Sequence, residues 1–319
     1  METNFENFYD KFDKAEFEEP WKNHNEAKKK ARHKGLIICA IMDIFLFILF
    51  ACVFIGDNLS ILSLILFSIF IIGLIDIVVI SIIEISSGTK YRIEYGRLYK
   101  AKLINGMLCN FFSDVTYFPY NSLNRNIYDS GLYNEYYNEY NSDDCAEAII
   151  DNKNAIRMAE VHTVNVQTHR DSKGHTHTTR TTMFHGLFAQ INIDSNLNCP
   201  IRIRTHDFWK SKREVEMDSN EFQKYFDVES EDRIKAMQFL THDVMEELIS
   251  FRKYLGTAFD IWITGTNIYI RLHVGSMFES VMSKDEVIYK RQAERYFNIL
   301  EFFYNLSKKI IAISEDNKF

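Results

Sequence analysis

Proline and glycine are scarce in this chain of 319 residues, which holds 3 Pro and 12 Gly. Because both residues concentrate in turns and linkers, their scarcity argues against long flexible spacers between domains. The glycine-rich loops that cradle phosphates are absent, since neither GxGxxG nor GxxxxGK[ST] occurs. The GxSxG and HExxH patterns of common hydrolases are missing as well. These absences favour a binding or regulatory protein over an enzyme.

Cysteine and positive charge are also limited. The five cysteines are an odd number and show no CxxC spacing, so we expect neither a disulfide framework nor a structural zinc knuckle. The formal net charge is -7. This charge disfavours nucleic acid as a partner, because nucleic-acid-binding proteins usually present a basic face to the phosphates.

What the sequence does contain is a long apolar region over residues 35–83. Two runs, 35–55 and 59–83, consist mostly of Ile, Leu, Phe and Val, and each holds one Asp. As helices with a rise of 1.5 Å per residue, both are long enough for a hydrocarbon core of ~30 Å. The apolar gain also exceeds the cost of one carboxylate. Residues 56–58 have the composition of a tight turn. The sequence therefore predicts a transmembrane helical hairpin.

Lysine and arginine flank this predicted hairpin. Six lie between residues 21 and 34 and five between residues 90 and 102, whereas the turn has none. The positive-inside rule then places both termini in the cytoplasm, with two spans in the inner or plasma membrane. We thus predict a cytoplasmic segment over 1–34, the hairpin, and a cytoplasmic domain over 84–319. The expected partners are the lipid bilayer and a membrane or cytoplasmic protein, and a homo-oligomer is left open.

The carboxylates within the two runs, Asp43 and Asp76, form a second hypothesis. An intramembrane carboxylate is often functional, either as a proton relay or as a polar contact that fixes how helices associate. In the alternative, each Asp is protonated or directed toward headgroup water. In an antiparallel hairpin the two would lie ~7.5 Å out of register along the helix axis.

The remaining region reads as an α+β domain. Residues 128–144 are rich in Tyr, Asn, Ser and Asp and suggest a long loop. Strands are predicted at 156–167 and 176–193, where β-branched and aromatic residues dominate. Alternation around the turn-like residues 264–267 predicts a hairpin. Helices are expected at 219–226, 243–254 and 285–313. These elements predict a mostly antiparallel sheet covered by helices.

Three histidines give the clearest chemical pattern. If residues 170–174 form a hairpin loop, His169 pairs with His175, and His177 projects to the same face. Three imidazoles at this spacing are typical of a site for Zn²⁺, Cu²⁺ or Ni²⁺. The alternative is an exposed polar hairpin tip, because a shift of one residue sends part of the set to the other face. Glu160, Arg202 and Arg204 either line a cleft or are surface charges.

An ordered series of short strings resembles a known family. The strings are Ala159-Glu160-Val161-His162-Thr163, Phe184-His185-Gly186-Leu187-Phe188, Met217-Asp218-Ser219-Asn220-Glu221-Phe222, Phe226-Asp227-Val228, Ile268-Tyr269-Ile270 and Met277-Phe278-Glu279. Together with a basic N-terminal segment before two adjacent apolar runs, they resemble a bacterial family catalogued as domain of unknown function 3137. The resemblance covers roughly residues 20–310. It implies an architecture but no activity.

Two functional hypotheses follow from these patterns. The first is a membrane-anchored cytoplasmic binding or regulatory module of unknown ligand, without a cofactor. The second is a membrane-bound metal-dependent enzyme that uses His169, His175 and His177 to hold zinc or another divalent transition metal. The absence of catalytic motifs favours the first.

Overall fold

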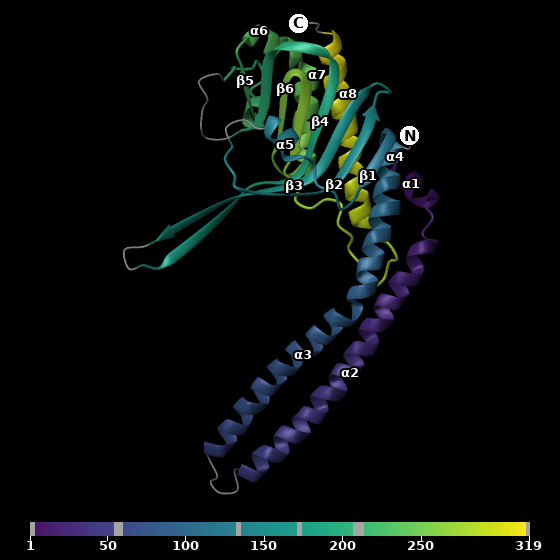
Figure 1. Ribbon diagram of the computed structural model, residues 1–319, viewed down its shortest axis with the longest axis vertical. Helices are drawn as coiled ribbons and strands as arrows, with labels where there is room; N and C mark the ends of the chain where they lie inside the picture. The colour runs from purple at the N-terminus through teal and green to yellow at the C-terminus, as the bar shows by residue number, and fades with distance from the viewer. Residues whose placement is uncertain (1–3, 54–59, 132–134, 171–173, 207–213, 317–319) are drawn as a thin grey trace. The chain divides into compact units, whose positions relative to one another are not determined.

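The computed structural model describes residues 4–53, 60–131, 135–170, 174–206 and 214–316. The chain forms two compact units (Figure 1). The helical unit consists of Phe12–Tyr99 and Ser280–Lys290. The α+β unit consists of Met1–Lys11, Lys100–Glu279 and Arg291–Phe319. The border between the two units therefore differs from the predicted start of the second domain at residue 84.

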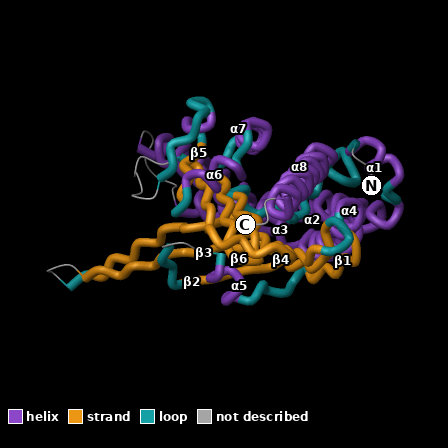
Figure 2. Tube along the Cα trace, turned by 90° about the horizontal axis from the view of Figure 1, so that it is seen from above, coloured by secondary structure: helices purple, strands orange, loops and turns teal. Residues whose placement is uncertain are grey.

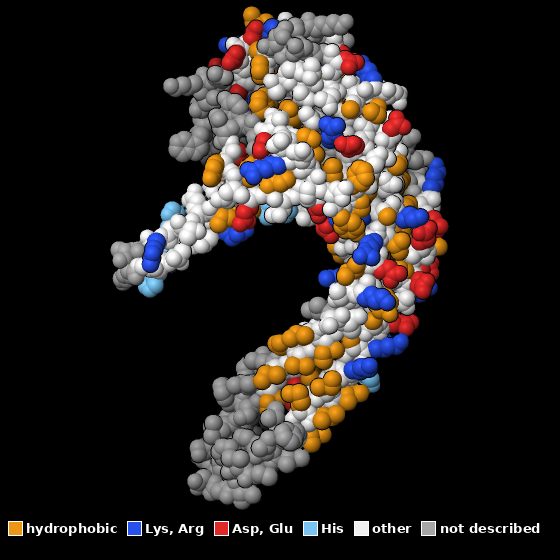
Figure 3. Space-filling model, in the orientation of Figure 1, with side chains coloured by type: hydrophobic (Ala, Val, Ile, Leu, Met, Phe, Trp, Pro, Cys, Tyr) orange, Lys and Arg blue, Asp and Glu red, His pale blue; other side chains and the backbone are white. Residues whose placement is uncertain are grey.

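Two long antiparallel helices, α2 (Ala15–Val53) and α3 (Ser60–Leu98), make up most of the helical unit. They approach closely at Gly88, where a Cβ atom would lie 2.8 Å from ring atoms of His24. The imidazole Nδ1 of His24 lies 3.0 Å from the carbonyl oxygen of Gly88. The segment Ser280–Lys290 joins this pair, because the indole of Trp21 donates to the carbonyl oxygen of Ser283 over 2.8 Å. Large apolar side chains such as Leu36 and Ile77 are exposed. Figure 3 shows apolar side chains gathered along the outside of this helix pair.

The prediction of a transmembrane hairpin is corrected here. Among the residues that the structure describes, no helix combines the length and the apolar character needed to cross a membrane. Both α2 and α3 continue well beyond the apolar runs into charged sequence. The predicted spans over 35–55 and 59–83 are therefore wrong on this finding. The turn predicted at 56–58 lies outside the described residues.

The predicted location rested on the same two spans. A protein with two spans in the inner or plasma membrane, and with both termini in the cytoplasm, is contradicted by the same result for the described residues. Helices do form over much of both runs.

A six-stranded antiparallel sheet forms the centre of the α+β unit. Its strand order is β1-β2-β3-β4-β5, and β6 pairs with β4. The strands are β1 (Ser113–Phe118), β2 (Glu139–Ile150), β3 (Asn154–Arg170), β4 (Thr176–Thr205), β5 (Phe226–Ser230) and β6 (Phe259–Leu272). The predicted strands at 156–167 and 176–193 are confirmed as parts of β3 and β4.

Helices cover both faces of this sheet (Figure 2). The two longer ones are α7 (His242–Leu255) and α8 (Lys290–Asp316), both close to their predicted positions. On α8, Ile299, Leu306 and Ile310 are buried. On the opposite face, Tyr128 of α5 packs against Phe184 and Phe188 of β4. The shorter helical elements are α1 (Phe5–Lys11), η1 (Tyr99–Ile104), α4 (Asn105–Phe111), α5 (Arg125–Ser130), η2 (Phe222–Lys224) and α6 (Arg233–Phe239).

Two local predictions were wrong. Residues 264–267 do not form a turn, because β6 continues through them and pairs with β4 on both sides of Gly265. The helix predicted at 219–226 is only the 3₁₀ turn η2, after which the chain enters β5.

The strands β3 and β4 extend past the rest of the sheet as a two-stranded ribbon (Figure 1). We call this ribbon the arm and define it as residues 165–170 of β3 and 176–181 of β4. Near its base, the side chain of Asn138 exchanges two hydrogen bonds with the backbone of Val166, of 2.7 and 2.8 Å. From residue 167 to residue 170 and from 176 to 181, every described side chain is exposed.

Candidate functional site

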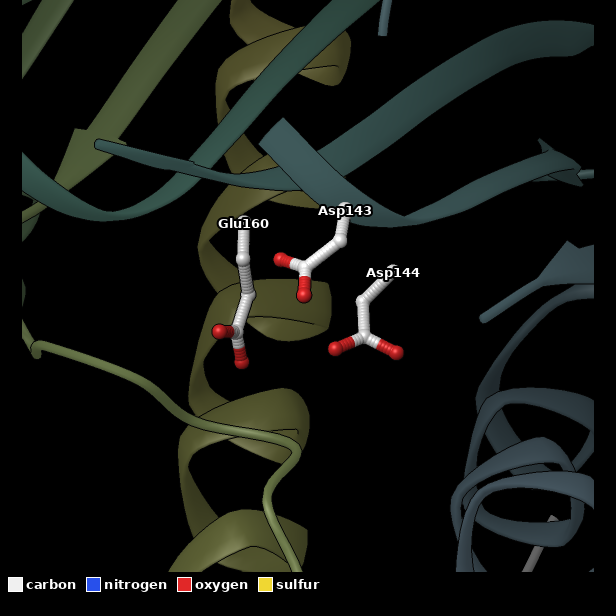
Figure 4. Close-up of side chains that lie close together, drawn as sticks. All are labelled: Asp143, Asp144 and Glu160. Atoms are coloured by element: carbon white, nitrogen blue, oxygen red, sulfur yellow. The ribbon is translucent and has the colours of Figure 1, made fainter. Parts of the chain in front are cut away.

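Two consecutive carboxyl groups, Asp143 and Asp144, lie on the same side of β2 (Figure 4). In a regular strand, neighbouring side chains point to opposite faces. Here the register of β2 against β3 shifts between Asp143 and Ala146, and Asp144 has a φ of 52°. This bulge turns both carboxyl groups toward Glu160, the direct cross-strand partner of Asp143. Ligand oxygens of the three residues lie within 4.8 Å of one another.

Lys100 neutralises part of this acidic cluster. Its ammonium Nζ donates to Asp144 Oδ2 over 2.6 Å and to Glu279 Oε1 over 2.8 Å. The hydroxyl of Tyr117 donates to the second carboxyl oxygen of Asp144. The side chains of Lys100 and Asp144 are 7% and 0% exposed. Both oxygens of Asp144 are thus engaged within the protein, so Asp144 anchors the cluster instead of facing a ligand.

Glu160 is buried on β3 and holds the segment after β6 in place. Its Oε1 atom accepts hydrogen bonds from the backbone amides of Met277 and Phe278. The amides alone would lower the pKa of Glu160, but burial outweighs them and raises it to about 8. Burial likewise raises the pKa of Asp144 to about 6. The pKa of Asp143 is also raised, by burial and then by Glu279.

The pKa of Lys100 is raised, against the effect of its own burial. Removing an ammonium from water lowers its pKa, but the hydrogen bonds to Asp144 and Glu279 have the larger combined effect. Lys100 is therefore charged at neutral pH. It supplies one positive charge against the carboxyl groups of Asp143, Asp144, Glu160 and Glu279.

A cavity of about 230 Å³ opens beside this cluster. Its lining includes Asn141, Asp143, Glu160, His162, His185 and Ser276. His162 and His185 are direct partners across β3 and β4, and their rings stack with centroids 4.5 Å apart. His185 Nε2 lies 3.2 Å from Ser276 Oγ. Burial, followed by the neighbouring His162, lowers the pKa of His185, so this imidazole is neutral at pH 7.

Gly186 fixes the position of this cavity against β6. A Cβ atom at Gly186 would lie 1.9 Å from the carbonyl oxygen of Leu272 and 2.8 Å from the backbone nitrogen of Val274. Both neighbours are backbone atoms, so a side chain cannot be accommodated by rotation of another side chain. Glycine at this position therefore allows β4 to pass close to the end of β6, next to His185.

The predicted histidine site is only partly assembled. His169 and His177 are direct cross-strand partners on the arm. The predicted pairing of His169 with His175 is wrong, because β3 continues through Arg170, whose partner is Thr176. His175 lies outside the strands, directly after Gly174 with its φ of 86°. The arrangement is thus a pair with a third histidine in the turn.

The predicted pair of aspartates lies in the helical unit. The thiol of Cys39 on α2 reaches the backbone carbonyl oxygen of Asp76 on α3 over 3.9 Å. Because Asp43 is four residues beyond Cys39, it lies about 6 Å along the helix axis from the level of Asp76. The Oδ1 atom of Asp43 is buried and has no hydrogen-bond partner among the described residues. A joint function of the two carboxylates stays a prediction.

Sequence reasoning identified Glu160 but missed its neighbours. Asp143 and Asp144 fell in the segment 128–144, which was predicted to be a loop, and Lys100 was counted only as part of a basic flank. The cross-strand pair of His162 and His185 was also missed.

Comparisons with known proteins give a family match over part of the chain but no activity. No curated protein matches the chain. A solved structure, the crystal structure of the mycobacterial trehalose monomycolate transport factor A, TtfA, is similar with a TM-score of 0.37 and 8% identity. That similarity covers 67% of this chain and 96% of the other. Residues 182–310 match the family model described as Protein of unknown function (DUF3137), which leaves out α2 and α3. The predicted resemblance to this family is confirmed over these residues.

Proposed function

We propose that the α+β unit is a binding module that holds a small organic cation in the cavity lined by Asp143, Glu160 and His185. The observation that carries this proposal is the imbalance of charge beside an open cavity. Asp143, Asp144, Glu160 and Glu279 present carboxyl groups, and Lys100 contributes a single ammonium to them. Since Asp144 is occupied by Lys100 and Tyr117, Asp143 and Glu160 are the groups that face the cavity.

The cavity suits a compact ligand with a protonated amine. Its volume of about 230 Å³ is below the ~300–1,000 Å³ of most drug-sized binding sites. Asn141, Ser276 and the neutral imidazole of His185 offer hydrogen-bond donors and acceptors around the carboxyl groups. An ammonium group placed between Asp143 and Glu160 would replace the proton that the buried Glu160 holds at neutral pH.

Titration calorimetry of the full chain tests this proposal with two protonated amines, ethanolamine and putrescine. We expect saturable binding of at least one amine at about pH 8, and at least tenfold weaker binding by Asp143→Asn. The matched control is Asp218→Asn, which changes an exposed carboxylate of the same unit and should bind as the wild type does. Equal affinity of Asp143→Asn and wild type would refute the proposal. So would stronger binding of Mg²⁺ than of either amine.

A further inference from the structure

The arm places two imidazoles directly opposite each other. Its strands pair in an unbroken register from Asn165↔Thr181 to Arg170↔Thr176, and His169↔His177 is one of these pairs. Directly opposed residues of an antiparallel pair have Cβ atoms ~4.5–5.5 Å apart. Two imidazoles at this separation can reach one metal ion, for which zinc–nitrogen distances are ~2.0–2.1 Å. Both histidines are exposed, so an ion has access to them.

The two faces of the arm differ in charge, because its arginines all lie on one of them. Because side chains alternate along a strand, His169 and His177 share their face with the neutral pairs Gln167↔Thr179 and Asn165↔Thr181. The pairs Val166↔Arg180 and Arg170↔Thr176 lie on the other face. Both arginines of the described arm therefore lie opposite the histidines. The histidine face carries no guanidinium that would repel a cation.

Each arginine also has a carbonyl or carboxylate partner. Arg170 Nε donates to the carbonyl oxygen of Gly174 over 3.3 Å and so closes the end of the arm. Arg180 Nη1 donates to Glu139 Oε1 over 3.0 Å at the base. These contacts hold the guanidinium groups on their own face, away from the two imidazoles.

We propose that His169 and His177 form a clip for a divalent transition metal across the arm. Neutral imidazoles are the ligands that Zn²⁺, Cu²⁺ and Ni²⁺ accept, and water completes the coordination. A two-stranded ribbon without a hydrophobic core is only marginally stable in water. A metal that joins the two strands would therefore order the arm. This site is separate from the cavity and does not depend on the function proposed for it.

Calorimetry with Ni²⁺ on the full chain, without a polyhistidine tag, tests the clip. We expect one Ni²⁺ per chain, with at least tenfold weaker binding by both His169→Ala and His177→Ala. His175→Ala is the matched control, because it removes an exposed imidazole only two residues from His177, and its affinity should stay within twofold of wild type. The Asp143→Asn variant should also bind Ni²⁺ normally, which separates this site from the cavity.

Amide hydrogen exchange gives a second readout, which reports where on the chain the metal acts. Ni²⁺ should slow exchange of the arm amides between Gln167 and Thr179 in wild type and in His175→Ala, but not in His177→Ala. Undiminished binding by His177→Ala would overturn the clip. An equal loss in His175→Ala would overturn the assignment to the pair, and loss in Asp143→Asn alone would assign the metal to the cavity instead.

Discussion

Lys100 and Asp144 form a buried ion pair, with 2.6 Å between Nζ and Oδ2. The same ammonium lies 2.8 Å from Glu279 Oε1. Lys100 is the first residue and Glu279 the last residue of the long segment that builds most of the α+β unit. One side chain therefore joins the two ends of this segment and also anchors the bulge of β2 that presents Asp143.

Replacing Lys100 with methionine should destabilise the α+β unit strongly. The side chain would keep much of its volume but lose its charge, which leaves Asp144 buried without its cation. Removing one partner of a buried ion pair typically costs about 3–5 kcal/mol. The free energy of unfolding from urea denaturation measures the effect.

A matched control is Lys153→Met, which breaks the more exposed ion pair with Glu315 and should cost much less stability than Lys100→Met, because solvent screens exposed pairs. The double variant Lys100→Met/Asp144→Asn should recover part of the loss, since it removes both charges. Similar losses of unfolding free energy for Lys100→Met and Lys153→Met would show that the buried ion pair contributes no more to stability than the exposed one.

The stability of wild type should fall relative to Glu160→Gln as the pH rises. Burial raises the pKa of Glu160 from 4.5 to about 8 in the folded protein. The folded state then binds more protons than the unfolded state between these values, so the contribution of Glu160 is full below about pH 4.5 and is lost as the pH rises through about 8. A glutamine can still accept the amides of Met277 and Phe278 but does not ionise.

Urea unfolding at three pH values between about 5 and 9 measures this dependence. The stability of Glu160→Gln minus that of wild type should increase over the range, by an amount on the order of a few kcal/mol. Glu294→Gln, which removes an exposed carboxylate of α8, is measured in parallel as a comparison variant. A difference between Glu160→Gln and wild type that stays constant with pH would mean that the buried carboxyl group is not protonated in the folded state.

Binding of an amine in the cavity should release protons. An incoming ammonium competes with the proton on Glu160, whose pKa burial raises to about 8. The apparent affinity should therefore rise as the pH increases from about 6 to about 8 and level off above that value. Calorimetry in two buffers with different ionisation enthalpies counts the released protons. Affinity that falls over this range would contradict a carboxylate site.

The sequence predicted the regular elements better than the site, because only the elements follow a period. Strands β3 and β4 and helices α7 and α8 show alternating or helical patterns and lie near their predicted positions. The turn predicted at residues 264–267 is wrong for a physical reason. The Oδ1 atom of Asn267 accepts hydrogen bonds from the side chains of Gln190 and Asn192 on β4. A residue type that is common in turns therefore links the paired strands β4 and β6 here.

The acidic cluster could not be predicted because it depends on a break in the alternating pattern. A regular strand would send Asp143 and Asp144 to opposite faces, and only the left-handed φ of Asp144 brings them together. The contact with Lys100 joins residues 44 positions apart, which no local pattern encodes. The histidine pair was nearly found, since the error was a register shift of two residues, which keeps side chains on the same face.

Alanine at Gly186 should destabilise the protein and weaken amine binding in the cavity. The added Cβ would meet the carbonyl oxygen of Leu272 at 1.9 Å, so β4 or β6 must shift. We expect a loss of about 2–3 kcal/mol, typical of overpacking against a rigid neighbour. Gly256→Ala is the comparison, because Gly256 has a φ of 67° and no atom within 4 Å of its Cβ position, and backbone strain alone costs about 1 kcal/mol. Equal unfolding free energies for the two variants would refute the close approach at Gly186.

Shortening the arm should leave the rest of the α+β unit intact. Residues 168–178 can be replaced by Asn-Gly, a pair that favours a tight hairpin turn, so that Gln167 and Thr179 remain paired. Every described side chain removed in this way is exposed, so the free energy of unfolding should change by less than about 1 kcal/mol. The shortened protein should lose Ni²⁺ binding and keep amine binding, and both are measured by calorimetry. A large loss of stability would show that the arm contributes to the fold itself, and retained Ni²⁺ binding would place the metal outside the arm.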